Sequence, residues 1–214
     1  ILAWDEEALL ISQASQRGDP FRHDGVVRAG DEFEMGGLAW RALAAPGHDM
    51  EALVFHCPAE RLLISGDALW EDGFGIVFGE ILGHPGALRA TRETLEAIAA
   101  LDVAIVIPGH GAPFGDFEAA LERAFRRHAA FEADPQRMGR NAVKACFTFN
   151  LLDLQRLPAA GLADYLESVP FFRDVGSRIL GKSTDELAGW LLDELLRARA
   201  VAIEDAFIVP RMAA

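Results

Sequence analysis

The order of apolar and polar residues predicts alternating strands and helices over the first two thirds of the chain. Residues 26–43 alternate short apolar runs with glycine turns, which is typical of strands. Two further apolar runs, 53–57 and 61–65, flank Pro58-Ala59-Glu60 and predict a β-hairpin. We expect helices over residues 5–16 and from Pro85-Gly86 to about residue 101.

A third helix is predicted after Asp116, a plausible N-cap. Residues at helical spacing then follow, namely Phe117, Ala120, Leu121, Ala124, Phe125, His128 and Phe131. We expect the three phenylalanines to lie in the core. His128 is expected on the helix surface or in an interface, and not as a metal ligand.

Composition changes at Ala133-Asp134-Pro135, which predicts two domains, residues 1–134 and 135–214. The second domain is predicted to be mainly helical, with breaks at 157–158, 169–170 and 180–181. Ser183-Thr184-Asp185-Glu186 is a capping-box signal before Leu187, Leu191 and Leu195. Residues 200–209 predict a short terminal hairpin.

Charge and composition narrow the classes of partner. The chain is 51% hydrophobic, enough for a full core, yet no apolar run approaches the roughly 20 residues of a membrane span. Residues 1–134 carry a net charge of −13 and residues 135–214 a net charge of zero, so nucleic acid is a poor partner. Cys57 and Cys146 are isolated, which favours a reducing compartment. We therefore expect a cytoplasmic protein with neither a nucleic acid nor a membrane as its partner.

Three short segments carry the candidate chemistry: Pro46-Gly47-His48, Ser65-Gly66-Asp67 and Pro108-Gly109-His110. Each places a metal-binding side chain after a turn-forming residue, and apolar, strand-like runs lead into the second and third. Strands that end in this way line sites at the edge of an α/β sheet. Two imidazoles and a carboxylate suit zinc or a similar metal. Alone, a Pro-Gly-His segment is more often a turn with a solvated histidine, and Asp67 alone could equally cap a following helix or turn.

The order His48, Asp67, His110, with separations of 19 and 43 positions, is more specific. Residues 28–70 and 103–114, which contain these segments, resemble the metallo-β-lactamase-fold hydrolases. The resemblance covers roughly residues 1–133 and implies an α/β fold, an αββα sandwich, followed by the helical region. Helices that precede a β-hairpin also resemble the winged-helix appendage of some members. Because its net charge is zero, we expect this region to act as a lid or as a dimerisation element of a homodimer.

The chain departs from the family pattern upstream of His48. Members carry an H-x-H-x-D-H segment about fifty residues earlier that supplies four metal ligands. Only 47 residues precede His48 here, and the only histidine among them is His23. Residues 1–4 predict a strand that enters the core without a start methionine, so we expect that an upstream portion is missing. The alternative is a protein that lacks the motif and has a crippled site.

The resemblance implies a dinuclear hydrolase with two zinc ions, or iron or manganese in their place. His48 would bind one metal, His110 the other, and the catalytic Asp67 would bridge them. A hydroxide held between the two metals would then attack a small-molecule ester, thioester, lactone or amide. A metal-dependent nuclease and a non-catalytic binding or assembly module are the alternatives. Trp70 and residues 74–78 fit an acyl-binding wall or core packing equally well. For His84, a contact with the substrate stays an open alternative, whereas His56 is expected to be solvated or packed.

Overall fold

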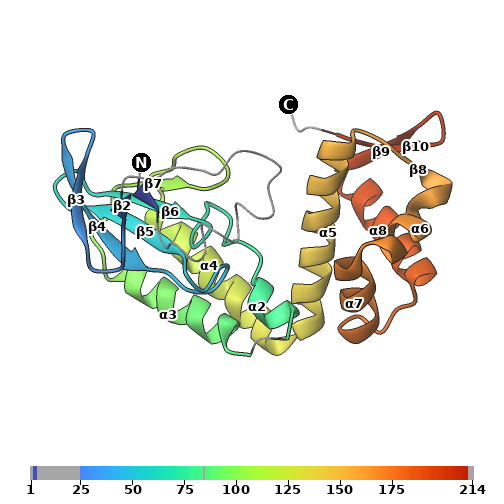
Figure 1. Cartoon of the computed structure of the whole chain (residues 1–214), viewed down its shortest axis with the longest axis horizontal. Helices are drawn as coiled ribbons and strands as arrows, with labels where there is room; N and C mark the ends of the chain where they lie inside the picture. Colours follow the sequence, from blue (N-terminus) through green and yellow to red (C-terminus); the bar gives the residue numbers. More distant parts are fainter. Residues whose placement is uncertain (1, 4–24, 84, 212–214) are drawn as a thin grey trace. The chain divides into compact units, whose positions relative to one another are not determined.

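The computed structural model describes residues 2–3, 25–83 and 85–211, which form two compact units, residues 1–132 and 133–214 (Figure 1). The sequence-based boundary after residue 134 lies two residues beyond this division. The predicted helix over residues 5–16, His23 and His84 lie outside the described residues.

The main sheet of the first unit has five strands in the order β3-β4-β5-β6-β7. Neighbours pair antiparallel except β6 and β7, which are parallel. A separate parallel pair joins β1 (Leu2–Ala3) to β2 (Gly25–Val26). The strands of the main sheet are β3 (Glu32–Met35), β4 (Leu38–Ala44), β5 (Leu53–Cys57), β6 (Leu62–Gly66) and β7 (Ile105–Pro108). The predicted hairpin over residues 53–65 is confirmed as β5 and β6.

The pairing of residues across the strands shows which side chains share a face of the sheet. Leu63 pairs with His56 on one side and Val106 on the other, and all three are buried. Helices α3 (Ala87–Ala99) and α4 (Phe117–Ala133) lie along one side of this sheet (Figure 1). On the opposite face, Phe55 and Ile64 pair with each other and are only half-buried. The sheet therefore has one closed apolar face and one more open face.

The start of helix α3 is fixed by a side-chain cap. The prediction for residues 85–101 is confirmed as α3, which starts at Ala87 after Gly86, a residue with a φ of 104°. The Glu80 carboxylate, from the short helix α2 (Phe78–Ile81), accepts hydrogen bonds from the Gly86 and Leu88 amides and so caps α3.

Helix α4 confirms the predicted apolar stripe. Phe117 and Phe131 are buried and Phe125 is half-buried. Of the two places expected for His128, the structure shows an interface, between α4 and α3, and not the helix surface, because this side chain is 1% exposed. Its Nε2 lies 2.8 Å from the Leu88 carbonyl oxygen, so the buried imidazole is satisfied by α3.

The second unit is mainly helical, as predicted, and the α/β class of the first unit is confirmed as well. Its helices are α5 (Pro135–Leu154), η1 (Ala159–Gly161), α6 (Leu162–Ser168), α7 (Pro170–Arg178) and α8 (Thr184–Arg197). The capping box at the start of α8 is confirmed, with Ser183 and Glu186 bonded reciprocally. None of the helices in the described part of the chain is both long and apolar enough to cross a bilayer.

A small antiparallel sheet completes the second unit in the order β8-β10-β9. The predicted terminal hairpin is confirmed as β9 (Val201–Glu204) and β10 (Phe207–Pro210). Its third strand, β8 (Leu157–Pro158), lies where the sequence indicated only a break between helices. Likeness to a winged helix stays a prediction.

Candidate metal centre

The three candidate ligands lie at one edge of the five-stranded sheet. Asp67 follows β6 directly, and His110 follows β7 at the same end because β6 and β7 are parallel. His48 lies in the loop after β4, which is two antiparallel steps from β6 and so runs in the same direction. The strand order therefore brings together side chains that are 62 positions apart in the sequence.

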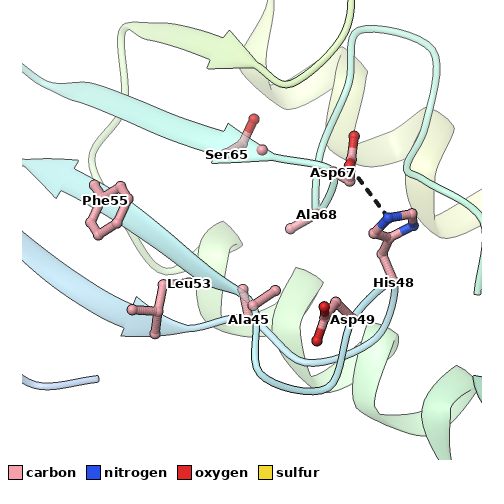
Figure 2. Close-up of a pocket in the computed structure, with 10 residues that line it drawn as sticks. Ala45, His48, Asp49, Leu53, Phe55, Ser65, Asp67 and Ala68 are labelled. Atoms are coloured by element: carbon pink, nitrogen blue, oxygen red, sulfur yellow. Dashed lines mark ion pairs between the residues drawn. The ribbon is translucent and has the colours of Figure 1, made fainter. Parts of the chain in front are cut away.

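The Asp67 carboxylate lies between the two imidazoles. Its Oδ2 is 3.4 Å from His48 Nε2, and its Oδ1 is 3.7 Å from His110 Nε2. Figure 2 shows His48 and Asp67 turned toward each other, with this ion pair dashed. Two ligand atoms that are each about 2.1 Å from one tetrahedral ion are themselves about 3.4 Å apart. The spacing thus fits a metal ion between each histidine and its facing oxygen.

Each oxygen of Asp67 faces a different histidine, which is the arrangement of a carboxylate shared by two ions. Across the parts of the chain that the structure describes, no three His, Cys, Asp or Glu side chains are placed to hold one metal ion together. The described residues therefore offer two donors to each position. Further donors would have to complete each coordination shell.

The orientation of the His48 ring is fixed from behind. Its Nδ1 lies 2.7 Å from the Ile76 carbonyl oxygen, and this acceptor requires the ring proton on Nδ1. In the neutral ring, Nε2 then carries the lone pair that faces Asp67. Histidines that bind metals usually donate their other ring N–H to a carbonyl or a carboxylate in this way.

Helix α3 holds the loop that carries His48. Thr94 donates its hydroxyl to the Pro46 carbonyl oxygen at 2.8 Å. Gly47 lies directly on Thr91, so that a Cβ at this glycine would be 2.4 Å from the Thr91 hydroxyl oxygen. The glycine of the first Pro-Gly-His segment is therefore required by the close approach of the loop to the helix.

Glycines also leave room around Asp67. A Cβ on Gly75 would lie 2.7 Å from His48 Nδ1, and one on Gly109 would lie 2.9 Å from Asp67 Oδ1. Gly66 has a φ of 50°, and its carbonyl oxygen accepts a hydrogen bond from the Gly109 amide at 2.8 Å. Two of these three glycines belong to the sequence segments, whereas Gly75 gave no recognisable signal.

A pocket of about 290 Å³ opens beside His48 and Asp67 (Figure 2). Leu53 and Phe55 of β5 lie at the end of the pocket opposite the two ligands. The remaining lining residues are Ala45, Asp49, Ala52, Ser65, Gly66 and Ala68. The wall is thus mostly apolar, with the Asp49 carboxylate as the other charged group.

Trp70 and residues 74–78, for which the sequence left an acyl-binding wall and core packing open, do not line this pocket. Phe74 is 1% exposed and packs edge-on against Phe131, so it belongs to the core. Phe78 lies instead against the His48 ring, with centroids 5.4 Å apart. Leu53 and Phe55 were missed as site residues, although their alternation in β5 could have placed them on the more open face.

The remaining described histidine of the sheet has a structural role. His56 is 6% exposed, and its Nε2 lies 3.1 Å from the Asp102 carbonyl oxygen. It points to the buried face, away from the edge that carries the candidate ligands. The expectation that His56 is a packed residue is confirmed.

Residues 2–110, just over half of the chain, match the family model of the metallo-beta-lactamase superfamily. The chain belongs to this superfamily. The match spans all three candidate ligands and ends at His110. It supports the α/β assignment but does not test the role of any single residue.

Curated relatives match parts of this superfamily member. A hydroxyacylglutathione hydrolase from Acidiphilium cryptum is 31% identical over 161 residues, which cover 71% of this chain and 56% of that protein. The lactamase-like protein nscB from Neosartorya fischeri is 30% identical over 100 residues, 47% of this chain and 28% of that protein. The chain thus spans about half, or less, of the length of these relatives.

Among solved structures, a metallo-beta-lactamase family protein from Thermus thermophilus aligns over 94% of this chain and 59% of its own. The identity is 20% and the TM-score is 0.48. At that TM-score the alignment adds nothing to the family assignment.

Proposed function

We propose that this protein is a metal-dependent hydrolase of small carbonyl substrates, with His48, Asp67 and His110 as metal ligands. The observation that carries the proposal is the Asp67 carboxylate, whose two oxygens face two different imidazoles. Membership of the superfamily and relatives named hydroxyacylglutathione hydrolase support the same class of reaction.

The donor set suits two zinc ions, since imidazole nitrogen and carboxylate oxygen are both common zinc ligands, and iron or manganese accept the same donors. When bound, such ions would lower the pKa of a coordinated water toward about 7 and polarise the carbonyl of the substrate. Asp67 would bridge the two positions. His48 would donate from Nε2 because its Nδ1 is bonded to Ile76.

The pocket supports an acyl substrate. Leu53 and Phe55 offer an apolar wall that would bind the acyl part and exclude water from it. Asp49 adds a negative charge near His48, which disfavours a carboxylate at that end of the substrate. The relatives named hydroxyacylglutathione hydrolase make an S-acyl glutathione thioester the first substrate to test, with its glutathione carboxylates directed away from Asp49, and simple thioesters and esters follow.

Elemental mass spectrometry and a thioester assay test the proposal on the purified full-length protein, which would have to supply the further donors to each position. We expect about two metal ions per chain and hydrolysis that chelators abolish. Asp67→Ala should lose both, while its melting temperature stays close to that of the metal-free wild type, since the side chain is part-exposed.

Asp72→Ala is the matched control, because its side chain is 93% exposed in the loop that follows the candidate ligand. This variant should keep both metal and activity. A wild-type protein that holds almost no metal after incubation with excess zinc would overturn the proposal. Hydrolysis that survives Asp67→Ala would remove Asp67 from the bridging position. Cleavage of phosphodiesters alone would favour a metal-dependent nuclease over a hydrolase of carbonyl substrates.

A further inference from the structure

Trp70 contacts two of the three candidate ligands. Its indole Nε1–H donates a hydrogen bond to Asp67 Oδ1 at 3.0 Å. Its ring lies edge-to-face against the His110 ring, with centroids 5.3 Å apart and an interplanar angle of 81°. One side chain therefore touches both the carboxylate and the second imidazole.

The backbone around Trp70 folds back onto the site. The Trp70 amide donates to the Gly73 carbonyl oxygen at 2.6 Å, and the Gly73 amide donates in return at 3.3 Å, which closes a tight turn. The Gly75 amide then donates to the Asp67 carbonyl oxygen at 2.8 Å. This turn, residues 70–75, is consequently anchored to the segment that carries Asp67.

Helix α4 holds the same turn from outside. Arg123 Nε donates to the Glu71 carbonyl oxygen at 2.6 Å. The Arg127 guanidinium lies over the Phe74 ring, 5.3 Å from its centroid. A Cβ on Gly73 would be 2.9 Å from Arg127 Cδ, so the turn and the arginine are in close contact. Trp70 is thus held in place by a helix that contributes no candidate ligand.

We propose that Trp70 is a positioning residue of the metal centre, an inference that rests on the proposed function. Rotation of a carboxylate about its last torsion is broad and only two-fold restricted. The indole N–H fixes Oδ1 of Asp67, so that Oδ2 faces His48 while Oδ1 faces His110. The indole ring also limits the orientation of the His110 ring. Trp70 does not bind the metal itself, because an indole offers only a donor.

The chain contains a matched comparison for this role. Trp40 in β4 also donates its indole N–H, to the Met35 carbonyl oxygen at 3.1 Å, and is 4% exposed. Its indole hydrogen bond is thus made to the backbone of its own hairpin and not to a candidate ligand. Replacing either tryptophan by phenylalanine removes an indole N–H bond and leaves an aromatic ring.

Zinc affinity of Trp70→Phe and Trp40→Phe, measured by competition with a chromophoric chelator, tests the inference. Loss of such a supporting contact commonly weakens metal binding by about 10- to 100-fold, and we expect this for Trp70→Phe. The visible spectrum of the cobalt-loaded Trp70→Phe protein should differ from that of the wild type. Trp40→Phe should lower only the melting temperature. Wild-type affinity in Trp70→Phe, or an equal loss in Trp40→Phe, would overturn the inference.

A second measurement needs no metal and separates this inference from the proposed function. In ¹⁵N–¹H spectra of the metal-free protein, Asp67→Ala should shift the Trp70 indole resonance and leave that of Trp40 in place. An unmoved Trp70 resonance would refute the hydrogen bond. A wild type without metal would remove the proposed function, and the indole shift would then decide the contact by itself.

Discussion

Gly75→Ala is the most direct perturbation of the candidate centre that leaves every candidate ligand in the sequence. Gly75 has no positive φ, so an alanine can adopt its backbone conformation. The new Cβ would lie 2.7 Å from His48 Nδ1 and 2.9 Å from the Asp67 Cβ. The effect of the substitution is therefore steric and directed at the two ligands.

The size of the effect follows from these distances. Ordinary contact to a Cβ begins at 3.4 Å, so the groups around position 75 must separate by about 0.7 Å on the His48 side. Distances at a metal site hold to within about 0.2 Å. The imidazole would also lose its 2.7 Å bond to the Ile76 carbonyl. We expect metal affinity to fall by at least about 10-fold and the free energy of unfolding by about 1–3 kcal/mol.

Chelator competition and urea unfolding measure the two quantities separately. Gly189→Ala is the control, because this helical glycine of α8 has no atom within 4 Å of the added Cβ. That variant should gain up to about 1 kcal/mol of stability and keep its metal affinity. If Gly75→Ala bound metal like the wild type, the metal would not lie between His48 and Asp67. If Gly189→Ala weakened binding equally, the effect would not be local.

Two further predictions concern groups away from the centre. His56→Ala removes a buried hydrogen bond to the Asp102 carbonyl oxygen. The free energy of unfolding, measured in urea, should therefore fall by about 1–3 kcal/mol while the metal content stays unchanged. Loss of metal in this variant would contradict our choice of ligands. Burial raises the pKa of the Cys146 thiol to about 11 from 9.0, so iodoacetamide should alkylate the native protein slowly at pH 8 and faster toward pH 11. Because the folded state holds this proton more tightly, the associated stability is full below pH 9.0 and is lost as the pH rises through about 11. Equal alkylation rates for native and unfolded protein at pH 8 would refute this.

The sequence indicated the strand ends that meet at the centre. A turn-forming glycine precedes each of His48, Asp67 and His110, and apolar runs lead into two of these segments. Strand direction then accounts for their convergence, since β4, β6 and β7 share one carboxyl-terminal edge. Local pattern was sufficient here because each ligand is adjacent in sequence to the strand that positions it.

Contacts between distant segments could not be obtained in the same way. His128 occupies a position of the apolar stripe in α4, and the sequence left both the helix surface and an interface open for it. Its burial depends on the Leu88 carbonyl, 40 positions away in the sequence. Likewise, Gly75 is one glycine among 20, and only the path of the turn brings it against His48. Tertiary packing decides such positions, and a single sequence does not show it.

The supports of the centre differ in chemistry from its candidate ligands. The ligands are charged or titratable side chains at the ends of strands, whereas their supports are a carbonyl at Ile76, an indole at Trp70 and glycines. None of these supports carries a charge, so they fix geometry without competing with the ligands for a cation. A change at a ligand should therefore remove metal at little cost to the stability of the metal-free fold. A change at a support should leave the donors in place but misdirect them, and so weaken binding without abolishing it.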